Sequence, residues 1–115
     1  MIIVYDSYTG LGKAFAESLG YPSQSVKEKL NQDCILITRN VGAGKIPWST
    51  KRFIKKNRHL IKGFVVNGDK VKHLATFCGA TPLIIEKYGL QHIRNIEGSG
   101  DSEDVEVVKD FLNHL

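Results

Sequence analysis

The sequence predicts a doubly wound α/β sandwich with a five-stranded parallel sheet in the strand order 2-1-3-4-5. Three short runs, at residues 2–5, 34–37 and 64–66, are apolar at every position, which is typical of strands buried on both faces. Segments with helical spacing of apolar residues separate them. Strands that alternate with helices favour right-handed crossovers and therefore a parallel sheet.

The first half of the chain supplies two helices and an edge strand. Leu11, Phe15 and Leu19 share one helical face, and Gly20 suits the end of that helix. A short edge strand is expected to contain Val26, near Ser25. Two apolar pairs seven residues apart, Phe53 with Leu60 and Ile54 with Ile61, extend a second helix to about residue 61. Ser49 or Thr50 is the expected cap at its start.

The second half completes the pattern. A third helix is expected over residues 81–88, with Pro82 in its first turn. Residues 91–96 form a weaker strand near the sheet edge. The last helix begins at Asp101 or Ser102, and its apolar stripe consists of Val105, Val108 and Leu112.

Length and composition fit one globular domain, residues 1–115. At 115 residues and 12.8 kDa, with 42% hydrophobic and 24% charged residues, the chain is neither disordered nor fibrous. Cys34 and Cys78 lie in apolar surroundings, as expected for buried free thiols in a reducing cytosol. No signal peptide begins the chain and no apolar run approaches a membrane span. We therefore expect a cytoplasmic protein that does not contact a membrane.

Charge is unevenly distributed. Residues 39–73 carry ten basic side chains against Asp69 alone, whereas residues 97–110 carry six acidic ones against Lys109 alone. The basic block suits an anionic ligand or partner, and a solvated helix face is the alternative interpretation. Nucleic acid is not expected as a partner, because Phe53 is the only aromatic residue of the basic helix and falls on its core face.

The first loop of interest leaves the first strand. In this architecture ligands lie beyond the carboxyl ends of the strands, at the point where the strand order reverses. Two hydroxyls and two glycines at a helix N-terminus suit a phosphate, and a helix cap without a ligand is the alternative. Ser7 and Ala14 stand where a nucleotide P-loop needs glycine and Ser or Thr. The candidate residues are Ser7, Tyr8, Thr9, Gly10, Leu11 and Gly12.

Two further loops follow the third and fourth strands. Each alone could be an ordinary connection or turn. Together with the first loop at the same sheet edge, they describe a site for a phosphate and a planar ring, which is the shape of flavin mononucleotide (FMN). The candidates are Thr38, Arg39, Asn40, Val41, Gly42, Ala43 and Gly44 in one loop, and Asn67, Gly68, Asp69 and Lys70 in the other.

The chain resembles the NrdI-type flavodoxins over nearly its whole length, in one register. The motifs that carry the resemblance are residues 5–10 (YDSYTG), Ile46-Pro47 leading to Thr50 and Phe53, residues 60–69 (LIKGFVVNGD), Phe77-Cys78, and residues 97–106 (EGSGDSEDVE). The resemblance implies a flavodoxin-like three-layer sandwich that binds FMN. It also implies that Ser7, Thr9 and Gly10 hold the phosphate and that residues 40–44 and 67–70 border the isoalloxazine ring.

The same resemblance implies a partner. In that family the reduced flavin passes electrons to dioxygen. The reductant that supplies these electrons to the flavin is not identified from the sequence. The superoxide or peroxide so formed reaches the dimanganese small subunit of class Ib ribonucleotide reductase, which then forms its tyrosyl radical. A general electron-transfer flavodoxin and a flavin-free binding module that uses the basic face are the alternative functions. A phosphorylated receiver domain is disfavoured, because Thr38 stands where its acceptor aspartate is needed.

The chain departs from the family pattern near the expected ring. Leu11 follows Gly10, no aromatic residue occurs at 39–41, and residues 72–74 replace an aromatic-glycine pair. Tyr8 or Trp48 could stack on the ring instead, although packing beneath the following helix is the preferred expectation for Trp48. Arg39 and Lys45 are expected to raise the potential of the second one-electron reduction. No catalytic residue and no metal site is expected, because the four histidines share no ligand spacing.

Overall fold

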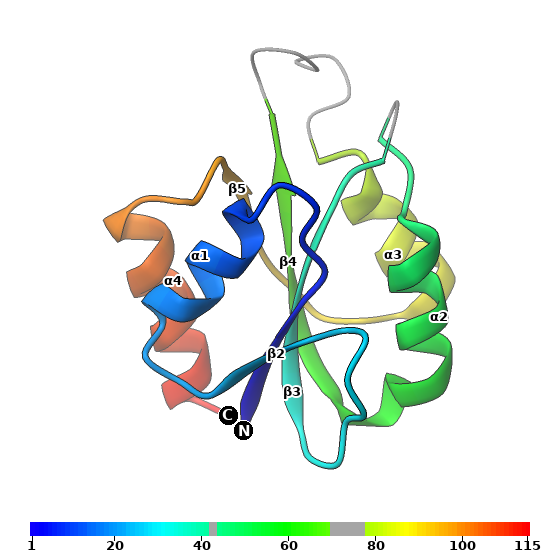
Figure 1. Ribbon diagram of the computed structural model, residues 1–115, viewed down its shortest axis with the longest axis horizontal. Helices are drawn as coiled ribbons and strands as arrows, with labels where there is room; N and C mark the ends of the chain where they lie inside the picture. Colours follow the sequence, from blue (N-terminus) through cyan, green and yellow to red (C-terminus); the bar gives the residue numbers. More distant parts are fainter. Residues whose placement is uncertain (42–43, 70–77) are drawn as a thin grey trace.

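The computed structural model describes residues 1–41, 44–69 and 78–115, and it confirms the predicted sheet (Figure 1). Five parallel strands are ordered β2-β1-β3-β4-β5. The elements in chain order are β1 Ile2–Tyr5, α1 Leu11–Ser18, β2 Ser23–Ser25, β3 Cys34–Arg39, α2 Trp48–Asn57, the 3₁₀ turn η1 Arg58–Leu60, β4 Ile61–Gly68, α3 Ala80–Tyr88, β5 His92–Glu97 and α4 Ser102–Asn113.

Helices cover both faces of the sheet, with α1 and α4 on one side and α2 and α3 on the other (Figure 1). Successive strand residues point to opposite faces, so Ile35 packs with α1 and α4 while Leu36 packs with α2 and α3. This is why the central strands are apolar at every position. Each such side chain, when fully buried, contributes about 1.5–3 kcal/mol of hydrophobic stabilisation.

The predicted course of the second helix was wrong at both ends. α2 ends at Asn57, Leu60 lies in η1, and Ile61 opens β4, where it pairs with Cys34. Ile61 therefore belongs to the sheet because it pairs with β3. Its seven-residue spacing from Ile54 does not indicate that both lie on one helix. Neither Ser49 nor Thr50 caps α2, because the helix begins after Pro47 and both hydroxyls lie in its first turn.

Other local expectations are confirmed. Pro82 lies in the first turn of α3, and Asp101 caps α4 by accepting from the Asp104 amide while the Asp104 carboxylate accepts from the Asp101 amide. Gly20 follows α1 with a φ of 75°. Val26 lies just outside β2, and its N–H donates to the Tyr5 carbonyl.

One crossover lacks a helix. The chain passes from β2 to β3 through residues 26–33, which form turns and irregular backbone. Cys34 and Cys78 are both buried free thiols, as expected. Among the described residues, no helix has the length and apolarity to cross a bilayer.

Candidate functional site

The carboxyl ends of β1, β3 and β4 meet at one edge of the sheet, at the top of Figure 1, which we call the carboxyl rim. Tyr5 pairs with Ile37, and Arg39 pairs with Asn67, so the residues that follow these strands leave side by side. The order reverses between β1 and β3, which makes this rim the topological switch point. The structure thereby confirms that the three candidate loops start from one edge.

The first loop presents the start of α1 to solvent. Gly10 is the N-cap residue with a φ of 90°, it makes no side-chain cap, and no heavy atom lies within 4 Å of where a Cβ would stand. Ser7 Oγ accepts from the Gly10 N–H at 3.0 Å, which leaves the Ser7 hydroxyl proton free to donate elsewhere. Tyr8 and Thr9 are exposed. Amides at the start of an uncapped helix attract an anion.

Beneath this loop lies a buried polar cluster, the Asp6 network, formed by Asp6, Ser49, Thr50 and Thr38. The Asp6 carboxylate accepts from Ser49 Oγ at 2.5 Å and from Thr50 Oγ1 at 2.6 Å. Thr50 Oγ1 also lies 2.5 Å from Thr38 Oγ1. Because the Thr50 proton goes to Asp6, Thr38 must be the donor to Thr50. The network ties β1 and β3 to the first turn of α2.

Arg39 joins the network to the rim surface. One of its terminal nitrogens lies 3.9 Å from an Asp6 carboxylate oxygen, and its guanidinium stands over the Tyr8 ring at 5.6 Å. Its Nε is buried without a hydrogen-bond partner among the described residues. Arg39 therefore brings a positive charge to the loop that precedes α1 and stacks on the Tyr8 ring of that loop.

A backbone bridge joins the two sides of the second loop. Val41 and Lys45 form an antiparallel bridge with N···O distances of 2.9 and 3.0 Å, and Gly44 has a φ of 78°. Asn40 Oδ1 accepts from the Ala80 amide at 3.0 Å, at the start of α3. The Asn40 side chain therefore holds the loop against α3. Two predicted site residues, Gly42 and Ala43, lie outside the described part of the chain.

At the third position, β4 runs further than predicted. Asn67 and Gly68 are strand residues that pair with β5, and Thr38 and Arg39 are β3 residues that pair with β4; the sequence placed all four in loops. Pairing between β3 and β4 extends past the last residue that pairs with β1, and pairing between β4 and β5 extends to Gly68. Asn67 Nδ2 donates to the Gly98 carbonyl in the connection between β5 and α4. Asp69 is exposed, and Lys70 lies outside the described residues.

The structure separates the candidates by what their side chains can reach. The candidates of the first loop that are at least partly accessible are Ser7, Tyr8, Thr9, Gly10 and Leu11. The buried candidates are Gly12, Thr38, Gly44 and Gly68. The Thr38 hydroxyl is occupied by Thr50. The preferred expectation for Trp48 was wrong: its side chain is 71% exposed and does not pack beneath α2.

Sequence reasoning missed the Asp6 network and the connection after β5. An aspartate that directly follows an apolar strand is a signal of a buried, partnered carboxylate, but its partners lie more than forty residues away at Ser49 and Thr50. The glycine-rich segment 98–100 was noted only as a motif. Gly98 donates its N–H to the Gly68 carbonyl, so this connection completes the rim next to β4.

The residues present fit a group that carries a phosphate. The uncapped start of α1 and the free hydroxyls supply anion donors, and Arg39 supplies a cation beside them. Gly10 leaves open space where a side chain would stand. Backbone can therefore approach a phosphate closely in this loop.

Comparisons with known proteins point in one direction. A family model described as NrdI flavodoxin-like matches residues 3–110. Protein NrdI of Bacillus licheniformis is 32% identical over 108 residues, covering 91% of this chain and 82% of that protein. Among solved structures, oxidised flavodoxin 2 from Bacillus cereus superposes with a TM-score of 0.65 at 20% identity, covering 96% of this chain and 92% of that one. A Fusobacterium nucleatum flavodoxin bound to flavin mononucleotide gives 0.56 at 19% identity, with 98% and 94% covered.

Proposed function

The chain belongs to the NrdI flavodoxin-like family, and from that premise we propose that it binds FMN at the carboxyl rim and acts as an electron carrier. The observation that supports this most directly is the uncapped start of α1, which lies at the topological switch point beside Arg39. A phosphate at this helix end is stabilised by backbone amides and by the helix dipole.

Each rim loop has a distinct part in this proposal. Ser7, Tyr8, Thr9 and residues 10–12 hold the phosphate through amides and hydroxyls. Residues 39–44 and 67–70 border the ring, and Thr38 lies buried behind them in the Asp6 network. The side chains of Asn40 and Asn67 act indirectly, because their hydrogen bonds to Ala80 and Gly98 fix the two loops to neighbouring elements.

Bound FMN supplies one-electron transfer, including transfer to dioxygen, and the chain sets the conditions for it. Arg39 places positive charge at the rim, and the Asp6 carboxylate, 3.9 Å away, offsets part of it. The hydroxyls of Ser49 and Thr50 hold that carboxylate in place. The sequence thus sets the local field through a fixed pair of opposite charges instead of a lone cation.

We further propose that the protein serves class Ib ribonucleotide reductase. In this proposal an unidentified reductant loads the carrier, and dioxygen is reduced to superoxide or peroxide. That oxidant is used to assemble the dimanganese–tyrosyl radical cofactor of the reductase small subunit. The proposal is supported by the family membership and by Arg39 and Lys45 at the rim, which attract an anionic oxidant or an acidic partner surface.

Titration of the apoprotein with FMN and with riboflavin tests the cofactor and its orientation together. Because the start of α1 is assigned to the phosphate, FMN should bind at least about tenfold more tightly than riboflavin. Ser7→Ala should narrow that ratio. Equal affinity for both compounds would contradict the phosphate assignment, and no binding of either would support a flavin-free binding module.

The reductase role is tested separately. Reduced protein is mixed with the manganese-loaded small subunit and dioxygen, and tyrosyl radical is measured by electron paramagnetic resonance. Radical should form only when the flavoprotein, the manganese-loaded subunit and dioxygen are all present. Oxygen consumption without radical formation would instead indicate a general electron-transfer flavodoxin.

A further inference from the structure

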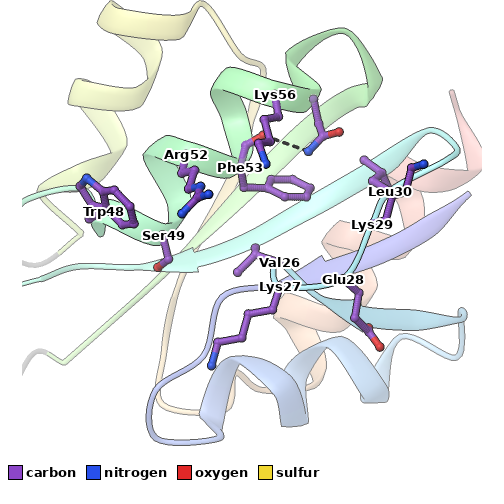
Figure 2. A pocket seen from close by; sticks show the side chains of 11 residues that line it. Val26, Lys27, Glu28, Lys29, Leu30, Trp48, Ser49, Arg52, Phe53 and Lys56 are labelled. Carbon is purple, nitrogen blue, oxygen red and sulfur yellow. Dashed lines mark hydrogen bonds between the residues drawn. The ribbon is translucent and has the colours of Figure 1, made fainter.

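A groove with a volume of about 590 Å³ lies between α2 and the irregular connection that follows β2 (Figure 2). Its size falls within the range of pockets that hold small molecules, which is also enough for one or two inserted side chains. No helix occupies the β2-to-β3 connection, so the second helical layer is thin at this place. The residues that line the groove are Val26, Lys27, Glu28, Lys29, Leu30, Trp48, Ser49, Arg52, Phe53, Lys56 and Asn57.

The floor of the groove is apolar. Phe53 and Leu30 are buried, at 4% and 8% exposure, and Val26 packs against the same core cluster. Figure 2 shows the Phe53 ring extending from α2 into the space above the connection. This floor offers contact area to an aliphatic or aromatic side chain of an incoming segment.

The rim of the groove is basic. Lys27, Lys29, Arg52 and Lys56 line it and are exposed. Glu28 is the acidic lining residue, and its carboxylate accepts from the Ser25 amide at 3.1 Å. Glu28 and Lys27 both point away from α2 in Figure 2, so Arg52 and Lys56 supply the charge on the α2 side of the groove. The surface that faces an incoming group therefore carries a positive potential.

Trp48 supplies a large aromatic surface at one end of the groove. It is the only tryptophan of the chain, is 71% exposed, and has the Arg52 guanidinium over its ring at 5.4 Å. An exposed tryptophan beside an arginine and next to an apolar pocket has the composition of a binding hot spot.

We propose that this groove docks an acidic peptide segment of the protein partner, with an apolar side chain inserted above Phe53 and carboxylates paired with Arg52 and Lys56. The inference rests on the proposed function, because that function supplies a protein partner. It adds a docking surface outside the carboxyl rim. The neighbouring Ser49 donates to Asp6, so an occupied groove lies next to the rim without covering it.

Two other occupants are disfavoured by the same observations. A second copy could offer the acidic side chains of α4, but α4 lies on the opposite face of the sheet from α2 (Figure 1). Such a head-to-tail contact would leave one groove and one α4 free and would propagate. Nucleic acid would need a continuous cationic track, whereas this rim surrounds an apolar floor sized for side chains.

The test compares two charge reversals one residue apart on α2. Lys56→Glu alters the groove, and Lys55→Glu makes the same change in net charge on the same exposed helix surface without lining it. FMN-loaded variants are titrated with the manganese-loaded reductase small subunit. We expect Lys56→Glu to weaken binding about 3- to 10-fold and Trp48→Ala about 30-fold or more, with Lys55→Glu within twofold of the wild type. The Trp48 indole N–H resonance reports occupancy in the wild type.

The outcomes separate the two proposals. If the wild type binds the subunit and all variants bind equally, the groove proposal fails while the proposed function stands. If the wild type does not bind the subunit at all, the groove proposal and the reductase role both fail, while FMN binding is decided separately by the flavin titration. Concentration-dependent self-association abolished by Lys56→Glu would assign the groove to a second copy. Binding of a single-stranded thymidine oligonucleotide that is lost in Lys56→Glu would assign it to nucleic acid. Each of these last two results overturns the inference.

Discussion

Removing the Thr50 hydroxyl should destabilise the protein strongly although it leaves the shape of the side chain almost unchanged. Thr50 is fully buried, donates to the Asp6 carboxylate at 2.6 Å and accepts from Thr38 at 2.5 Å. A hydrogen bond to a charged group contributes about 1.5–3 kcal/mol and a neutral one about 0.5–1.5 kcal/mol. Thr50→Val is therefore expected to lower the free energy of unfolding by about 2–4 kcal/mol.

Urea denaturation followed by far-ultraviolet circular dichroism measures this loss. With a typical m-value of about 2 kcal/mol/M, the midpoint should fall by about 1–2 M. Thr50→Ser is the matched control, because it keeps the hydroxyl and removes one buried methyl group, at a cost of about 1 kcal/mol. The same variants should order in the same way for FMN affinity, since Asp6 positions Arg39 at the rim.

A double-mutant cycle identifies the cause. In an Asp6→Asn background the charged acceptor is absent. The loss of unfolding free energy caused by Thr50→Val should therefore be smaller there than in the wild type, by at least about 1 kcal/mol. If Thr50→Val were as stable as Thr50→Ser, or if its cost were unchanged by Asp6→Asn, the hydrogen bonds of the Asp6 network would not be what stabilises this corner of the fold.

Three further predictions concern the sheet, the last helix and the rim. Gly63→Ala would place a Cβ 2.8 Å from Cδ1 of Ile93, so it should cost about 1–3 kcal/mol in urea denaturation, and adding Ile93→Val should recover part of that loss. Burial opposes ionisation of Asp104, but hydrogen bonds from Arg94 and from the Asp101 amide outweigh it and hold its pKa below the ordinary 3.8. Its stabilising contribution is thus present above that value and is lost as the pH falls toward the folded-state pKa, so wild type should lose more stability than Asp104→Asn between about pH 5 and pH 3. Arg39→Glu should lower the potential of the second one-electron reduction of bound FMN by roughly 20–40 mV, equivalent to ~0.5–1 kcal/mol, and Asp6→Asn should raise it; equal potentials in a spectroelectrochemical titration would remove both residues from the account.

The sheet could be predicted because its determinants are local and strong. Fully apolar runs, such as residues 34–37, report burial on both faces without knowledge of the neighbours, and the parallel order follows from chain connectivity. The start of α1 was equally readable, since hydroxyls and glycine precede an amphipathic stretch. The end of α2 was not, because pairing of Ile61 with Cys34 decides it.

Side-chain roles at the rim were harder to predict, since they depend on partners remote in sequence. Thr38 and Asn40 have the composition of ligand-binding residues, yet their side chains bond to Thr50 and to the Ala80 amide. Trp48 was expected to pack beneath α2, but α2 turns it outward, while Phe53 lies on the buried face as predicted. Composition indicates which residues gather at a sheet edge, while the packing of the helices decides which of them remain free.

The connection after β5 has a consequence for how the protein is made. The Gly98 backbone bonds to the last two residues of β4: its N–H donates to the Gly68 carbonyl and its carbonyl accepts from the Asn67 side chain. Gly100 approaches Phe15 of α1 so closely that a Cβ would lie 2.6 Å from that ring. Chain segments emerge from the ribosome in sequence order, so residues 98–100, made after all five strands, fasten the end of β4 and contact Phe15 of α1. A nascent chain halted before residue 97 would lack both contacts, so the rim to which we assign FMN would be incomplete until residues 98–100 have been translated.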